Sequence, residues 1–118
     1  MKTFKQFLTE AKKSSSKYKE GEFGYWWTVI KGREDIEGKV YDGNIYGSDE
    51  DLTSLRGAPK EVKGDFWFSY NKLKSLKGCP QKVGGDFNFN YNKLTSLEGG
   101  PKEVGGKFGC EHNKLTSL

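Results

Sequence analysis

The residues of this 118-residue chain that are best suited to catalysis or metal binding are Cys110 and His112, which are separated by one position. A thiol close to an imidazole can form a nucleophile–base pair or supply two ligands to zinc. The repeat described below places Cys110 at an inward position and His112 at an outward one, so we expect the two side chains to point apart. A structural zinc site usually needs four ligands, and no others are apparent. The sequence therefore predicts no metal site and no cofactor.

The remaining polar residues show no catalytic arrangement. Carboxylates are scattered over outward positions and form no pair suited to acid–base work. The Gly-Gly and Gly-x-Gly steps recur in every repeat, which is typical of turns and not of a phosphate-binding loop. We predict no catalytic residues, so the chain is not expected to be an enzyme.

An internal repeat with a period of 21 residues dominates the chain. It comprises LTSLRGAPKEVKGDFWFSYNK (52–72), LKSLKGCPQKVGGDFNFNYNK (73–93) and LTSLEGGPKEVGGKFGCEHNK (94–114), followed by LTSL (115–118). The alternation in V-x-G-x-F-x-F predicts a strand with one buried face, on which Val62, Phe66 and Phe68 point inward. An asparagine that follows each strand is expected to bond the backbone of its own and the adjacent coil. These residues are Asn71, Asn92 and Asn113.

The pattern F-x-F-x-x-N-x-L resembles the leucine-rich-repeat signature L-x-L-x-x-N-x-L, with Phe in the strand positions. It is similar to the compact leucine-rich repeats common in bacterial and phage proteins, and the resemblance covers about residues 41–118. It implies a mainly β fold, a short parallel β-solenoid of 21-residue leucine-rich-type repeats that binds other proteins.

The segments before the repeats are expected to cap this solenoid and to extend from it. Residues 41–51 repeat the pattern in degenerate form, with Gly47 in place of a Phe. Residues 23–40 are aromatic and β-branched around a turn, which predicts a β strand or hairpin that covers the open end. Residues 12–22 read as a flexible basic linker. Residues 1–11 form one apolar helical face and predict a short amphipathic helix, which can also pack on the body or self-associate.

The first eleven residues, MKTFKQFLTEA, also resemble the capsid-targeting leader of the internal head proteins of T-even-like phages. Those leaders begin with Met-Lys-Thr and end in a Leu/Ile-x-Glu sequence that the prohead protease cuts. Leu8 and Glu10 match this cleavage pattern, which implies a mature start at Ala11. The resemblance implies a protein in the phage capsid interior that is injected with the DNA into the host cytoplasm.

The distribution of charge and apolar residues limits the partners. The net charge of +4 lies in residues 1–20, which contain six Lys and two Glu, whereas residues 21–118 contain 14 basic and 14 acidic residues. Nucleic-acid binding depends on clustered positive charge, so we do not expect it for the repeat body. No apolar run is long enough to span a membrane, and no secretory signal is evident. Cys79 and Cys110 occupy different repeat positions and are expected to be free thiols.

Outward-facing aromatic residues are the best candidates for contact with a protein partner, since they bury a large area at low entropic cost. The predicted binding surface consists of Tyr46, Trp67, Tyr70, Asn88, Asn90, Tyr91 and His112, with Asn44, Asp65, Asp86 and Lys107 alongside. The alternative is that the N-terminal segment covers Trp67.

Three functions are consistent with these features. The first is a non-catalytic protein-binding module, an injected phage internal protein that inhibits or modulates a host factor such as a defence enzyme. The second is a structural component associated with the capsid or scaffold. The third is a regulator that binds nucleic acid through its basic tail.

Overall fold

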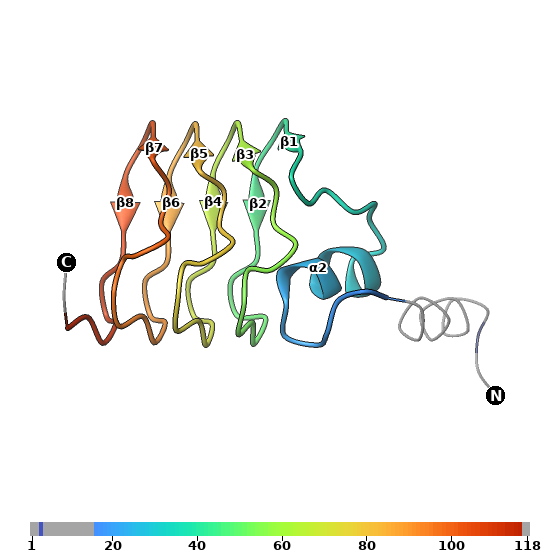
Figure 1. The fold of residues 1–118 in the computed structure, drawn as a ribbon, viewed down its shortest axis with the longest axis horizontal. Helices are drawn as coiled ribbons and strands as arrows, with labels where there is room; N and C mark the ends of the chain where they lie inside the picture. Colours follow the sequence, from blue (N-terminus) through green and yellow to red (C-terminus); the bar gives the residue numbers. More distant parts are fainter. Residues whose placement is uncertain (1–2, 4–15, 117–118) are drawn as a thin grey trace.

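The computed structural model describes residue 3 and residues 16–116. The predicted leader helix at 1–11, except for residue 3, and the first part of the predicted linker (12–15) lie outside the described residues. Within the described part, the chain winds into a parallel β-solenoid whose coils are stacked side by side along the long axis of Figure 1. The predicted solenoid of 21-residue repeats is confirmed.

Two four-stranded parallel sheets form the walls of the solenoid. Sheet 1 contains β1 (Val40–Tyr41), β3 (Glu61–Val62), β5 (Lys82–Val83) and β7 (Glu103–Val104). Sheet 2 contains β2 (Ile45–Tyr46), β4 (Phe66–Trp67), β6 (Phe87–Asn88) and β8 (Phe108–Gly109). Every strand pairs with the strand 21 residues away, as in Phe66 opposite Phe87.

The division into two sheets differs from the single strand expected over V-x-G-x-F-x-F. The chain turns a corner between the Val and the first Phe of each repeat, so the Val row and the Phe rows lie in different sheets. Successive backbones come very close at this corner: a Cβ on Gly64 would collide with the amide oxygen of Asn44 and approach the Gly43 carbonyl oxygen to 2.7 Å. Glycine is therefore required there for close approach, and it ends the strand.

Stacked aromatic and aliphatic rows fill the interior. Phe66 and Phe87 are fully buried, with ring centroids 6.1 Å apart, and Phe87 stacks on Phe108 at 5.1 Å. Phe108, in the last described coil, remains 42% exposed. Leu52, Leu73 and Leu94 are buried and belong to the same core. The predicted inward positions are thus confirmed.

The asparagine row is also confirmed, and it fastens each coil to the one before. The side chain of Asn92 accepts a hydrogen bond from Leu73 N (3.0 Å) and donates to the carbonyl oxygens of Phe68 (2.9 Å) and Phe89 (3.1 Å). Asn71 and Asn113 make the corresponding bonds one coil earlier and one coil later. Asn71 and Asn92 are buried, so these bonds satisfy backbone groups that water does not reach.

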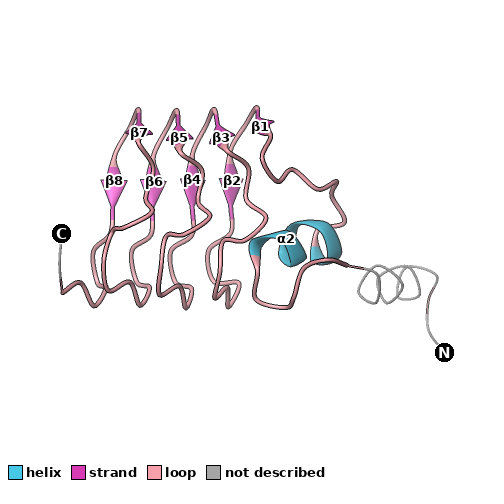
Figure 2. Cartoon of the chain, viewed as in Figure 1, coloured by secondary structure: helices cyan, strands magenta, loops and turns pink. Residues whose placement is uncertain are grey.

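The cap at residues 23–30 is helical, so the prediction of a β strand or hairpin there is wrong. A single α-helical turn, α2 (Phe23–Tyr25), continues into a π-helical turn, η1 (Trp26–Ile30), at the end of the solenoid (Figure 2). The first coil has Gly47 where the next two coils have Phe, and Phe23 and Trp26 pack in this region against Phe68 with ring centroids 5.8 and 5.7 Å apart. A helix can present both large side chains on one face, three positions apart.

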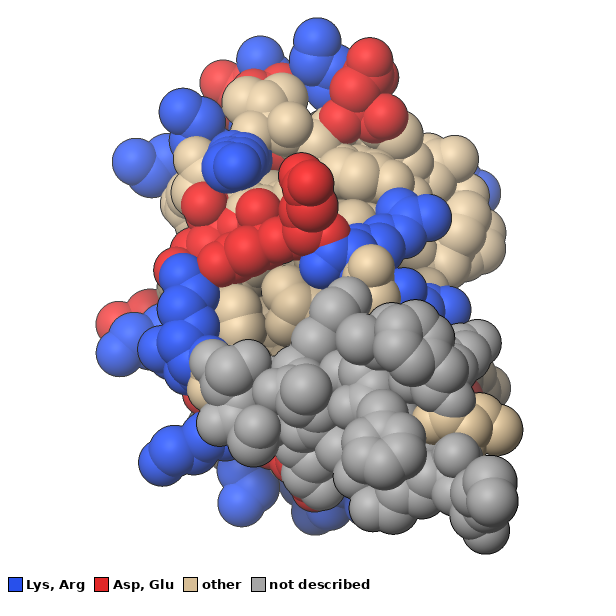
Figure 3. All heavy atoms as spheres, turned by 90° about the vertical axis from the view of Figure 1, so that its right-hand side faces the viewer, with Lys and Arg blue, Asp and Glu red and all other residues tan. Residues whose placement is uncertain are grey.

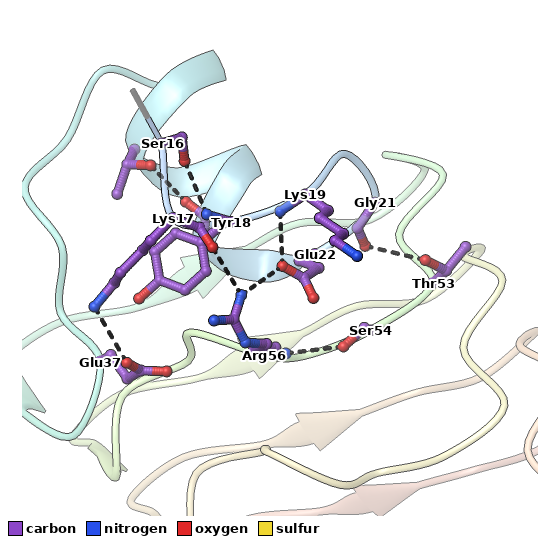
Figure 4. A network of polar contacts seen from close by, with 12 residues as sticks. Ser16, Lys17, Tyr18, Lys19, Gly21, Glu22, Glu37, Thr53, Ser54 and Arg56 are labelled. Carbon is purple, nitrogen blue, oxygen red and sulfur yellow. Dashed lines mark hydrogen bonds and ion pairs between the residues drawn. The ribbon is translucent and has the colours of Figure 1, made fainter. Parts of the chain in front are cut away.

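The described part of the predicted linker, residues 16–22, is fastened to the body and is not a flexible connection. Figure 4 shows Arg56 between Glu22, at 2.8 Å, and the carbonyl oxygen of Lys17, at 3.2 Å. Tyr18 is buried and its hydroxyl donates to Asp35 at 2.8 Å. Burial alone would raise the pKa of Asp35, but hydrogen bonds from Lys17, the Glu37 backbone and Tyr18 outweigh it and lower that pKa. The carboxylate of Asp35 therefore stays ionised at this junction, in contact with Lys17 and Tyr18.

Candidate partner-binding surface

The first part of the predicted surface is an aromatic pair on the outer side of sheet 2. Tyr46 on β2 lies in register with Trp67 on β4, and both side chains point away from the core because their strand neighbours Ile45 and Phe66 point into it. The rings meet edge to face with centroids 5.0 Å apart. Tyr46 is 51% and Trp67 37% exposed, so the described residues leave a large part of the Trp67 side chain accessible.

The second part is a stack of three rings at the turns that follow β4, β6 and β8. Tyr70 lies 4.5 Å from Tyr91 with the rings nearly parallel, at 6°, and Tyr91 lies 4.2 Å from His112 at 7°. Tyr70 and Tyr91 are exposed, and His112 is exposed as well. The three residues occupy one position of the 21-residue repeat, so the coil spacing itself produces the stack.

The backbone at these three positions is unusual for aromatic residues. The φ angles are +58° at Tyr70, +60° at Tyr91 and +56° at His112, in the left-handed region that favours Gly, Asn and Asp. In the first coil the same position holds Asp49, with φ +59°, which suits that conformation better. A tyrosine there costs about 1 kcal/mol relative to residues that tolerate the conformation. The rings are thus held on the surface against the local preference of the backbone.

Asn88 and Asn90, also predicted for this surface, serve the solenoid with their amide oxygens. The oxygen of Asn88 accepts hydrogen bonds from Ser69 Oγ (2.7 Å) and from the backbone N–H of Asn90 (3.0 Å). The oxygen of Asn90 accepts from the backbone N–H of Glu111 at 2.8 Å. Both side chains are half-buried. Because their amide oxygens already accept hydrogen bonds within the chain, these two side chains have fewer groups left to bind a partner.

Two carboxylates that the sequence placed alongside the predicted binding surface lie beside the aromatic pair. Asp65 and Asp86 stand two residues before Trp67 and Asn88, on the same side of the chain. Asp65 accepts a hydrogen bond from the Tyr46 hydroxyl at 3.1 Å with one oxygen and from the backbone N–H of Asp86 at 2.8 Å with the other. The period of two residues along a strand was the sequence signal for this placement.

His112 is exposed and Cys110 is half-buried. The ring of His112 stacks on Tyr91, whereas Cys110 occupies the position of Phe68 and Phe89, which are core residues. Among the residues that the structure describes, no three His, Cys, Asp or Glu side chains are grouped so that they could hold a metal ion.

A hollow of about 610 Å³ lies elsewhere, between segments of residues 53–60 and 75–81. Its lining includes Arg56, Pro59, Lys77 and Cys79, and none of the residues of the aromatic surface. Burial raises the pKa of the Cys79 thiol to about 12. The thiol is therefore protonated near neutral pH and is a poor nucleophile.

Charged side chains of both signs lie on the end of the molecule that carries the cap. Figure 3 shows acidic side chains gathered in a band on this face, with Lys and Arg on both sides of it. Among the described residues, this view shows no continuous basic surface of the kind that phosphate backbones require. Within residues 16–116, no helix has the length and apolar character needed to cross a membrane.

Comparison with known proteins adds no relative to this description: no family model matches the chain, and neither curated proteins nor solved structures give a match.

Proposed function

We propose that this chain is a non-catalytic protein-binding module, and that its partner docks on the aromatic surface formed by Tyr46, Trp67, Tyr70, Tyr91 and His112. One observation carries the proposal. Tyr70 and Tyr91 stay exposed on the surface in a left-handed backbone conformation that Asp49 fills more readily in the first coil. Neither ring contributes to the buried core.

The energetics of the stack support a role beyond folding. Each stacked aromatic pair stabilises the fold by about 0.5–1.5 kcal/mol, and each left-handed tyrosine costs about 1 kcal/mol. The two terms roughly cancel, so the rings add little net stability. Rigid, exposed Trp and Tyr side chains are the residue types that most often dominate the binding energy of protein interfaces.

The test compares two variants that remove exposed apolar side chains from different places. Purified wild type, Trp67→Ala/Tyr91→Ala and the control Ile30→Ala are immobilised and exposed to lysate of the host bacterium. Ile30 is 61% exposed on η1, outside the aromatic surface, so its variant controls for the loss of an exposed apolar group. We expect the double variant to recover about tenfold less partner, and the Ile30 variant to match wild type. Equal recovery by the double variant and wild type would remove the aromatic surface from the interface.

We further propose that the module is an internal head protein of a phage, packaged with the DNA and injected to inhibit or modulate a host factor. The support is the resemblance of residues 1–11 to a capsid-targeting leader, with Leu8 and Glu10 in the cleavage pattern. The described core begins at Tyr18, so cleavage before Ala11 leaves all of its residues in the mature chain. During assembly the capsid or scaffold is then a second partner.

Mass spectrometry of purified virions tests this placement. The expected result is a chain that begins at Ala11 and is lost from heads that have released their DNA. A chain retained in emptied heads in fixed stoichiometry would instead support a structural capsid component, and a chain absent from virions would contradict packaging.

A further inference from the structure

The charges of Asp65 and Asp86 are not needed by the fold. Each carboxylate accepts a hydrogen bond from the backbone N–H 21 residues ahead: Asp65 from Asp86 N and Asp86 from Lys107 N, both at 2.8 Å. In the first coil the same bond is accepted by Asn44, from Asp65 N, also at 2.8 Å. A neutral amide therefore fulfils this structural role, and the negative charges at 65 and 86 are additional to it.

No ion pair joins either carboxylate to a described Lys or Arg side chain, although Lys107 occupies the next position of the same row. The first coil contains Asp42, Asp49, Glu50 and Asp51, and no Lys or Arg occurs between Lys39 and Arg56. Of these acidic side chains, only Asp51 has an ion pair with a described residue, the exposed contact with Lys72 at 3.3 Å. The aromatic pair of sheet 2 thus stands on an acidic part of a molecule whose body is balanced overall.

The carboxylates act on the aromatic pair directly. Burial raises the pKa of the Tyr46 hydroxyl, and so do its hydrogen bond to Asp65 and the charges of Asp65 and Asp86. The Tyr46 ring in turn packs against Trp67. A ring face beside fixed carboxylates favours a cation, because the ring quadrupole and the negative charges attract it together.

We infer that the partner segment that docks at Tyr46 and Trp67 is basic, and that it places a Lys or Arg side chain against Trp67 within reach of Asp65 and Asp86. The inference rests on the proposed function and specifies the chemistry of its partner. A phosphate backbone or an acidic peptide would meet repulsion at this place, so the carboxylates also select against those partners.

The probe is a capped hexapeptide of alternating glycine and arginine, titrated into the 15N-labelled full chain while the Trp67 indole N–H and the amides of Asp65 and Asp86 are followed by NMR. Capped peptides with glutamine or glutamate in place of arginine are the comparison ligands. The test variant is Asp65→Asn/Asp86→Asn, which keeps the acceptor that Asn44 uses. The control, Glu61→Gln/Glu98→Gln, makes the same charge change away from the pair.

We expect saturable shifts with the arginine peptide only, and an affinity lowered roughly fivefold in the Asp65→Asn/Asp86→Asn variant but not in the control. Unchanged thermal unfolding shows that the variants are folded. Equal shifts with the glutamine peptide, no saturable shift with arginine, or equal loss in both variants would each overturn the inference. The proposed function fails separately, through the recovery experiment with Trp67→Ala/Tyr91→Ala. If partner recovery depends on Trp67 and Tyr91 but not on Asp65 and Asp86, the aromatic surface is supported as the binding site and the basic character of the partner is refuted.

Discussion

Replacement of Asn92 by alanine tests how the coils are held together. The Asn92 side chain makes three hydrogen bonds of 2.9–3.1 Å with backbone groups of Leu73, Phe68 and Phe89, and it is only 7% exposed. Each bond contributes about 1 kcal/mol net, and a buried backbone group left unpaired costs about 1–3 kcal/mol. The Asn92→Ala variant should therefore lose about 3–4 kcal/mol of unfolding free energy.

Asn113 provides the matched control, since it makes the same three kinds of bond in the last described coil but is only part-buried. Water can replace its bonds, so Asn113→Ala should cost about 1–2 kcal/mol. Urea unfolding followed by tryptophan fluorescence measures both values, because Trp26 and Trp27 are buried in the cap. If Asn92→Ala costs no more than Asn113→Ala, the burial argument for the asparagine row is wrong.

Two further changes probe the cap and the buried thiol. Gly47→Ala should destabilise the protein by about 1–3 kcal/mol, because a Cβ there would collide with the Phe68 ring; an unchanged urea midpoint would show that Phe68 can move aside. Iodoacetamide at pH 8 should modify Cys110 well before Cys79, since Cys79 is 5% exposed and burial raises its pKa to about 12. Because folding raises this pKa from its ordinary 9.0, the thiol's contribution to stability is complete below pH 9 and is lost as the pH rises toward 12. Equal alkylation rates for the two thiols, read by mass spectrometry of the peptides, would refute this burial argument.

The repeat allowed the interior to be predicted residue by residue. Once the period of 21 is known, every coil has the same backbone path, so Phe66 and Phe87 must lie at equivalent places one coil apart. The same reasoning placed Trp67 outward and Asn71 at the turn. It also assigned Tyr70, Tyr91 and His112 to the same position of the repeat. It could not predict the left-handed backbone at that position, because Tyr and His do not favour this conformation.

The cap could not be predicted in the same way, because it occurs once. Residues 23–30 are rich in Trp, Tyr, Val and Thr, which favour strands when judged by propensity. The spacing of Phe23, Trp26 and Trp27 is that of a helical face, and this was the signal that aromatic composition concealed. In the structure the helical turn packs Phe23 and Trp26 against Phe68, whose ring lies next to Gly47 of the first coil.

The sequence by itself therefore determined the solenoid, its inward and outward positions and its asparagine row, because a repeated local pattern forces a repeated backbone. Only the tertiary structure decided that the corner glycines divide the wall into two sheets, that the cap is helical, and that Asp65 accepts a hydrogen bond from the Tyr46 hydroxyl. Those features depend on contacts between segments far apart in the chain, where packing and close approach outweigh local preference.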